Sequence, residues 1–171
     1  PLGPFQAKAT ATSISPWIVT KDALEPFRCS TPKREYDLLP YLKDTKPMLY
    51  DIELSTYIQT EASNEILLST TNFREMYYSS AQQIAHHTSS GCPMNVCDLI
   101  GSGTISGEEK NQRGSMLELS WGGKEPIKLE NNETRTFLED GDLLTLRGQC
   151  NGSNYSIGFG KCSGRILPAK K

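Results

Sequence analysis

A glycine-rich segment, residues 101–107, holds the residues of this sequence best suited to binding an anion. Glycines at alternating positions let the backbone approach a ligand closely and point successive N–H groups at it. The hydroxyl groups of Thr104 and Ser106 add two further donors. The segment is therefore predicted to bind a carboxylate or an enolate, although the same composition is also typical of ordinary loops.

Glu118 is the carboxylate whose surroundings suit it best to act as a base. Polar and apolar residues alternate over residues 116–121, which predicts a strand with Glu118 on the same face as Met116 and Ser120. If the opposite, apolar face packs on the core, Glu118 either is solvated or lines a cleft. In a cleft it would serve as a general base.

The histidine pair His86-His87 suggests a metal site only at first sight. Adjacent residues on a helix diverge by about 100° and do not converge on one ion. No carboxylate or third histidine lies four residues further along. Both histidines are therefore expected to pack or to cap the helix. Lys8, considered by itself, is expected to lie at the surface.

The chain is 171 residues long, with 36% hydrophobic and 22% charged residues and a net charge of −2. This size favours a single domain. The balanced charge argues against a nucleic acid or an anionic membrane as partner. No apolar run approaches the roughly 18 residues that a membrane-spanning helix needs. Five irregularly spaced cysteines fit neither a disulfide framework nor a zinc site, and reduced thiols predict a cytoplasmic protein.

The elements expected to position these side chains are short strands and one helix. Alternating residues predict a strand over residues 48–58, paired as a hairpin with a strand over residues 65–69. Apolar residues at spacings of three and four predict a helix over residues 72–87, capped by Thr70, Thr71 or Asn72, with Gly91 near its end. Further strands are expected at residues 98–100, 116–121, 127–129, 143–148 and 155–159, with turns at residues 122–123, 140–142 and 151–152.

The first 47 residues contain seven of the ten prolines. Proline blocks helix interiors and central strands, so this segment is expected to be irregular, with one short strand over residues 17–19, and to pack against the rest of the chain. One main helix among many strands predicts a β-rich α+β fold.

Several blocks of residues, spread over nearly the whole chain, form an ordered pattern. They are Pro1-Leu2-Gly3-Pro4-Phe5, Ser15-Pro16-Trp17-Ile18-Val19, Asp22-Ala23-Leu24, Leu39-Pro40-Tyr41-Leu42, residues 102–107, residues 114–121 and Ile157-Gly158-Phe159-Gly160. The pattern resembles the fumarylacetoacetase family. The glycine-rich segment alone would suit the wider fumarylacetoacetate hydrolase superfamily, whereas the Ser-Pro-Trp and GSMLELSW blocks resemble the eukaryotic-type hydrolase. The resemblance implies a mixed β-sandwich roll of the C-terminal domain type.

The resemblance also implies roles for particular residues. Lys8 and Thr12 match positions at the family's metal site, Thr104 matches the threonine that hydrogen-bonds the substrate, and Glu118 matches the glutamate that helps a catalytic histidine to activate water. The implied cofactor is a divalent cation, Ca²⁺ or Mg²⁺ or both, acting as a Lewis acid. The implied reaction is hydrolysis of the carbon–carbon bond of fumarylacetoacetate to fumarate and acetoacetate, in tyrosine and phenylalanine breakdown, by a homodimer.

Residues 1–171 are accordingly expected to form the C-terminal portion of such a catalytic domain, without its N-terminal part. The chain begins at Pro1 instead of methionine, which indicates truncation or processing. The family's catalytic histidine and carboxylate metal ligands lie upstream of the first matching block, so this chain alone is expected to be inactive. Ala7 and Ala11 stand where relatives often have glycine, which predicts a changed backbone path around Lys8.

Two alternatives to this function remain at this point. Another superfamily chemistry, acylpyruvate hydrolysis or oxaloacetate decarboxylation, would use the same cation with a different acid–base partner, and the presence of Glu118 favours fumarylacetoacetate instead. The other alternative is an inert fragment that acts only as a scaffold or a dimerisation half.

Overall fold

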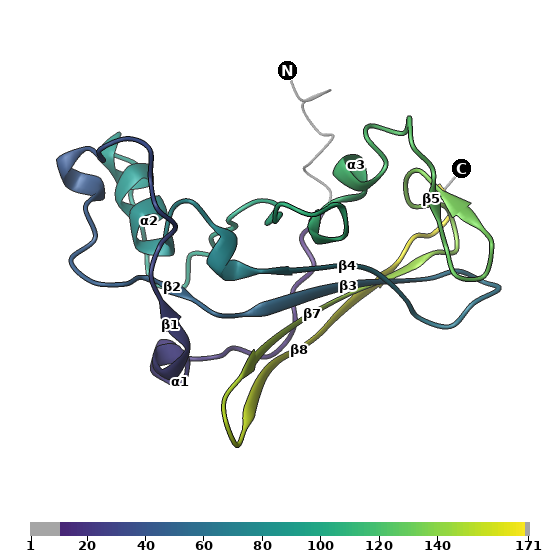
Figure 1. Cartoon of the computed structure of the whole chain (residues 1–171), viewed down its shortest axis with the longest axis horizontal. Coiled ribbons are helices and arrows are strands. Elements are labelled where there is room, and N and C mark those ends of the chain that lie inside the picture. Colours follow the sequence, from purple (N-terminus) through teal and green to yellow (C-terminus); the bar gives the residue numbers. More distant parts are fainter. Residues whose placement is uncertain (1–10, 170–171) are drawn as a thin grey trace.

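The structure is a computed structural model that describes residues 11–169. Its centre is a four-stranded antiparallel sheet with the order β4-β3-β7-β8 (Figure 1). The strands are β3 (Glu53–Gln59), β4 (Ile66–Asn72), β7 (Leu143–Asn151) and β8 (Ser156–Arg165). Consecutive strands form the two hairpins β3–β4 and β7–β8, and the pairing of β3 with β7 joins them.

Short elements flank this sheet. The strands β1 (Arg28–Cys29) and β2 (Leu49–Tyr50) pair with each other, as do β5 (Ile127–Lys128) and β6 (Thr134–Arg135). The α-helices are α1 (Lys21–Leu24), α2 (Ser80–Ser89) and α3 (Met116–Leu119). The 3-10 helices are η1 (Glu25–Phe27), η2 (Pro40–Leu42), η3 (Phe73–Glu75) and η4 (Lys110–Gln112).

The core consists of two small clusters of apolar side chains at different places along the sheet. Phe27, Tyr50, Ile52 and Cys150 form the first, and Ile58, Ile66 and Leu129 form the second. Burial raises the pKa of the Cys150 thiol, and also that of Cys29, so neither thiol is readily ionised. All five cysteines are free thiols.

The strand predictions are confirmed where alternation was strongest. The strand predicted over residues 48–58 is divided into β2 and β3, which belong to different sheets, with a break at Asp51 and Ile52. β4 pairs with β3 as the expected hairpin. The strands at residues 127–129, 143–148 and 155–159 are also present, although β7 and β8 are longer than predicted. Three predicted strands are wrong: residues 17–19 and 98–100 are irregular backbone, and the stretch predicted as a strand over residues 116–121 contains a short helix.

The main helix is present but was placed too early. β4 continues through Asn72, and the Phe73 amide donates to the Ile52 carbonyl at 2.9 Å, which holds this segment to the sheet. The helix α2 begins only after Ser79, whose hydroxyl accepts from the Gln82 amide while the Gln82 side chain accepts from the Ser79 amide. This capping box fixes the start. Gly91 follows the helix end with φ of +84°, as expected.

The fold class is therefore confirmed as β-rich α+β with one main helix. Within the part of the chain that the structure describes, no helix is long and apolar enough to cross a membrane.

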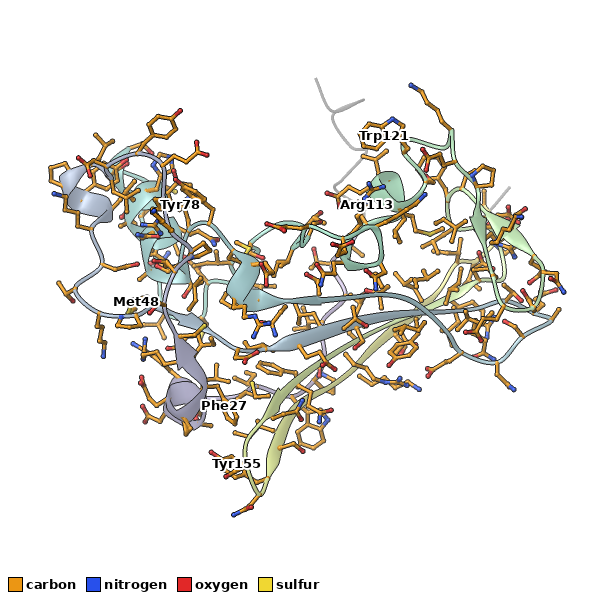
Figure 2. The ribbon with its side chains drawn as sticks, in the orientation of Figure 1. Phe27, Met48, Tyr78, Arg113, Trp121 and Tyr155 are labelled. Atoms are coloured by element: carbon orange, nitrogen blue, oxygen red, sulfur yellow. The ribbon has the colours of Figure 1, made fainter. Side chains whose placement is uncertain are left out.

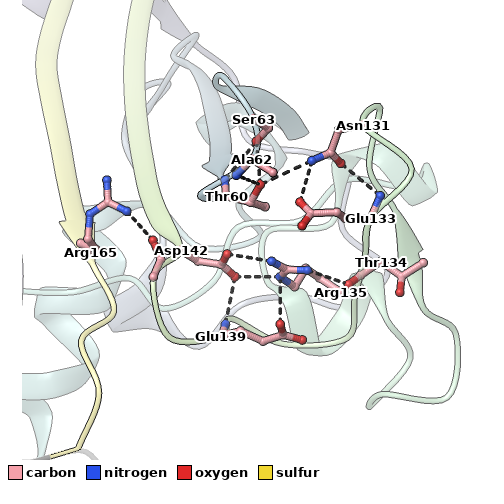
Figure 3. Close-up of polar contacts among 11 residues, drawn as sticks. Thr60, Ala62, Ser63, Asn131, Glu133, Thr134, Arg135, Glu139, Asp142 and Arg165 are labelled. Atoms are coloured by element: carbon pink, nitrogen blue, oxygen red, sulfur yellow. Dashed lines mark hydrogen bonds and ion pairs between the residues drawn. The ribbon is translucent and has the colours of Figure 1, made fainter.

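A buried ion pair joins the β5–β6 ribbon to the start of β7 (Figure 3). Asp142 is 1% exposed, and its two carboxylate oxygens accept from Nε and Nη2 of Arg135 at 3.0 and 3.1 Å. The Glu139 amide donates to the same carboxylate at 2.9 Å. The hydrogen bond to Asp142 raises the pKa of Arg135, so the guanidinium stays charged. The pair is satisfied on both sides and fixes the turn that begins β7.

The proline-rich segment packs against the sheet as expected, at Gly160 in β8. Ser15 Oγ donates to the Phe159 carbonyl at 2.5 Å, and a Cβ on Gly160 would lie 2.3 Å from Trp17 Cδ1. Gly160 also has φ of +76°. Two blocks of the family pattern thus meet at a position where the chain needs glycine for both space and backbone conformation.

Gly160→Ala is expected to destabilise the full-length protein by about 1–3 kcal/mol, because it adds a clash to a left-handed backbone. The thermal midpoint should fall, and the fluorescence of Trp17 should shift as the segment detaches. Gly158→Ala is the matched control on the same strand, since its Cβ would meet no atom within 4 Å. Equal thermal midpoints for the two variants would show that the packing of Trp17 on β8 does not require glycine at position 160.

Candidate active site

Glu118 lies in the first turn of helix α3, and the prediction of a strand over residues 116–121 is wrong. Ser115 caps the helix, because its hydroxyl accepts from the Glu118 amide at 3.3 Å. A serine three residues before a glutamate is a helix-start signal that outweighs alternation over so short a stretch. Leu119 and Ser120 are buried, whereas Glu118 is half-buried.

Two serine hydroxyls hold the Glu118 carboxylate, and both bind the same oxygen. Ser106 Oγ donates to Glu118 Oε2 at 2.9 Å, and Ser115 Oγ donates to it at 3.0 Å. Among residues 11–169, Oε1 receives no hydrogen bond. The carboxylate is therefore fixed through one oxygen while the other can contact a further group.

The glycine-rich segment, residues 101–107, lies against the chain that leads into α3. The Gly114 amide donates to Ser106 Oγ at 3.0 Å. A Cβ on Gly114 would lie 2.2 Å from the Ile105 carbonyl oxygen and 2.8 Å from Thr104 Cγ2, so only glycine allows this approach. The segment is irregular, and Thr104 is exposed and accessible to a ligand.

The end of α3 carries local backbone strain. Trp121 has φ of +50°, which is unusual for a bulky residue and costs about 1–2 kcal/mol. Arg113 stabilises this region: its Nη1 donates to the Glu118 carbonyl at 2.9 Å, and its guanidinium lies 5.7 Å from the Trp121 ring (Figure 2). Strained residues of this kind are frequent at functional sites.

An apolar groove of 530 Å³ lies beside α3, between the helix and the sheet. Its lining includes Leu68, Met116, Phe137 and Leu144. The lining is mostly apolar, with hydroxyl groups from Thr56, Ser69 and Ser115, and it includes neither Thr104 nor Glu118.

The predicted metal residues are only partly within the described chain. Lys8 and Ala7 lie outside the described residues, and Thr12 is an exposed residue of the N-terminal segment. Residues 11–169 include no group of three His, Cys, Asp or Glu side chains that could hold a metal ion. The Thr12 hydroxyl is a neutral and therefore weak ligand, so residues 11–169 do not form a cation site by themselves.

The two adjacent histidines have separate contacts at the end of α2. His86 stacks on Tyr41 with its Nδ1 3.0 Å from the phenol oxygen, and His87 Nε2 lies 3.1 Å from Cys92 Sγ. Their rings are used for packing and local hydrogen bonds.

Sequence reasoning assigned no role to three residues of this constellation, Arg113, Gly114 and Ser115, and a different role to Ser106. Ser115 could have been identified from the Ser-x-x-Glu pattern, which predicts a capped helix. Ser106 was noted only as a possible donor to a ligand. For Gly114 and Arg113 no local signal exists, because their roles depend on contacts with Ile105 and Trp121.

Comparison with known proteins identifies relatives of the whole chain. The family model for the fumarylacetoacetate (FAA) hydrolase C-terminal domain matches residues 1–167. The chain is 48% identical to the fumarylacetoacetase of Homo sapiens over 170 residues, which is 99% of this chain and 41% of the human protein. It is 47% identical to that of Arabidopsis thaliana, covering 99% of this chain and 40% of the relative. For Aspergillus fumigatus the identity is 49%, with 100% and 40% covered. The chain thus spans about 40% of the length of these relatives.

Proposed function

Because the chain belongs to the fumarylacetoacetate hydrolase C-terminal family, we propose that the full-length protein hydrolyses the carbon–carbon bond of 4-fumarylacetoacetate. The products are fumarate and acetoacetate, and the reaction is the last step of tyrosine and phenylalanine breakdown. The proposal treats this chain as the part of the enzyme that contributes Thr104 and Glu118.

The observation that carries the proposal is the junction of Thr104, Ser106 and Glu118. The family resemblance assigns a substrate contact to Thr104 and a share in water activation to Glu118. In the structure these two blocks meet at the Ser106 hydroxyl, which lies 2.9 Å from Glu118 Oε2 and 3.0 Å from the Gly114 amide nitrogen. Residues that act on one substrate need such proximity.

In the proposed reaction, water adds to the ketone carbon next to the fumaryl double bond. The bond from that carbon to the neighbouring methylene then breaks, and the methylene carbon takes the electron pair and a proton. The Thr104 hydroxyl donates a hydrogen bond to a substrate oxygen. Glu118, whose Oε1 accepts no hydrogen bond from residues 11–169, orients the base that takes a proton from water. The rest of the protein supplies this base.

A divalent cation, Ca²⁺ or Mg²⁺, is part of this proposal. When bound, it supplies Lewis-acid stabilisation of the substrate oxygens. Because the described residues do not form a cation site alone, Lys8 and Thr12 would contribute only together with carboxylates from elsewhere in the protein. We further propose that the full-length protein is a homodimer.

Substrate comparison tests the function directly. The full-length protein should consume fumarylacetoacetate, followed by its ultraviolet absorbance, with equal amounts of fumarate and acetoacetate released. An acylpyruvate and oxaloacetate serve as competing substrates. Faster turnover of either one would replace the proposed function by the other superfamily chemistry. The 171-residue chain alone should be inactive.

Removal of the cation is expected to abolish turnover. Dialysis of the full-length protein against EDTA should lower kcat by at least about 100-fold, because the polarising charge is lost. Titration with Mg²⁺ and with Ca²⁺ in parallel should restore it and identify the preferred ion. Full activity after exhaustive chelation, with no metal found by elemental analysis, would exclude the cation from the reaction.

A further inference from the structure

We propose that Ser106 is a positioning residue, which fixes Glu118 through Oε2 and joins its orientation to that of the Thr104 segment. The inference rests on the proposed function, since it assigns Ser106 a task within that reaction. It concerns a residue that touches neither the substrate nor the reacting water.

The hydrogen-bond directions around Ser106 are fully determined. Its hydroxyl has one proton, which it donates to Glu118 Oε2 at 2.9 Å. The direction of this bond follows from the carboxylate oxygen being an acceptor, and the Ser106 oxygen in turn accepts from the Gly114 amide at 3.0 Å. Ser106 therefore cannot donate to a ligand at the same time, and its hydroxyl serves the carboxylate.

Glu118 is consequently held from two independent parts of the chain. Ser115 belongs to the cap of α3 and follows the helix wherever it moves, whereas Ser106 belongs to the substrate-binding segment. The bond from Ser106 relates the carboxylate directly to the segment that carries Thr104. Hydrogen bonds to a charged group are among the stronger ones, and both of these end on one atom.

The close packing around Gly114 makes this relation rigid. The Ile105 carbonyl and the Thr104 methyl group lie where a Cβ of Gly114 would be, so the two segments have no room to slide closer. A base or its orienting partner must be placed within a fraction of an ångström to be effective. Loss of the Ser106 hydroxyl leaves Glu118 with Ser115 alone and lets its carboxylate rotate.

The experiment compares variants of the full-length protein with fumarylacetoacetate as substrate. Ser106→Ala is expected to lower kcat about 10–100-fold, the effect of losing one hydrogen bond to a charged group, with KM changed less than about threefold. Ser90→Ala is the control, because it removes a serine hydroxyl outside the site, at the end of α2, where Ser90 Oγ donates to the His87 carbonyl at 3.3 Å. Its kcat should be that of the wild type.

A double-mutant comparison separates positioning from a general structural role. If Ser106 acts through Glu118, Ser106→Ala should have no further effect on kcat in a Glu118→Gln background. An equal loss in both backgrounds would overturn the inference. So would a wild-type kcat for Ser106→Ala. The isosteric pair Ser106→Thr and Ser106→Val repeats the test should the alanine variant fold poorly: only the valine variant should lose turnover.

These outcomes differ from failure of the proposed function. If the wild-type protein does not hydrolyse fumarylacetoacetate, the function itself is wrong. If Glu118→Gln is impaired while Ser106→Ala is normal, only the role of Ser106 is wrong.

Discussion

Replacing Glu118 with glutamine in the full-length protein is expected to lower kcat for fumarylacetoacetate by about 10²–10⁴, the usual contribution of a positioned acid–base group. The amide has the size of the carboxylate, and its oxygen can still accept from Ser106 and Ser115. Helix α3 and the thermal midpoint should therefore be preserved. What is lost is the negative charge and the basic oxygen at the position of Oε1.

Steady-state kinetics with measured thermal midpoints provides the check. Glu125→Gln is the matched control, because it removes the same charge from the segment just after α3, where Glu125 forms an exposed pair with Lys110 at 2.6 Å. Exposed pairs of this kind contribute little, so this variant should have the wild-type kcat. An unchanged kcat in Glu118→Gln would remove Glu118 from the mechanism.

Asp142→Asn is expected to be the most destabilising single change, with a loss of about 3–5 kcal/mol in the free energy of unfolding. The side chain is 1% exposed and accepts hydrogen bonds from Arg135 at 3.0 and 3.1 Å. Asparagine directs an NH₂ group at the guanidinium and leaves a buried cation without its anion. The turn before β7 and the β5–β6 ribbon should both loosen.

Calorimetry of the full-length protein measures this effect as a fall in thermal midpoint. Glu139→Gln is the control, because Glu139 contacts the same guanidinium at 3.5 Å but its side chain is 62% exposed. Its midpoint should stay near that of the wild type. Similar midpoints for both variants would mean that the buried pair contributes no more than a surface one.

Much of the sheet could be predicted because burial imposes a period of two on its strands. Burial alternates over residues 50–53, at the approach to β3, and the hairpin of β3 with β4 was predicted in the correct pairing. The turns at Gly122, Gly141 and Gly152 were also found, because glycine marks chain reversal.

The errors arose where a local pattern had two readings. Residues 116–121 alternate like a strand, yet the Ser115 cap and four residues suffice for a helical turn. In the same way, Phe73 and Met76 have helical spacing, but the pairing of β4 with β3 extends the strand through Asn72. α2, which was placed too early, follows a Ser-x-x-Gln sequence, and α3, which was predicted as a strand, follows a Ser-x-x-Glu sequence. That signal outweighs periodicity in short segments.

The candidate site could be predicted as residues but not as an arrangement. Thr104 and Glu118 were identified separately, from a family pattern and from residue type. Their connection through Ser106 depends on the close approach of Gly114 to Ile105, a contact between segments that no local pattern encodes. The placement of Lys8 and Thr12 at a metal site stays a prediction.

The most direct test of the account is a crystal structure of the full-length protein with a non-hydrolysable dicarboxylate analogue of fumarylacetoacetate. We expect Thr104 Oγ1 to donate to an oxygen of the analogue at about 2.6–3.2 Å. Glu118 should keep both serine contacts on Oε2 and direct Oε1 toward a histidine or water beside the scissile carbon. An analogue bound elsewhere, with Oε1 facing bulk solvent, would contradict the proposal that this chain supplies one side of the active site.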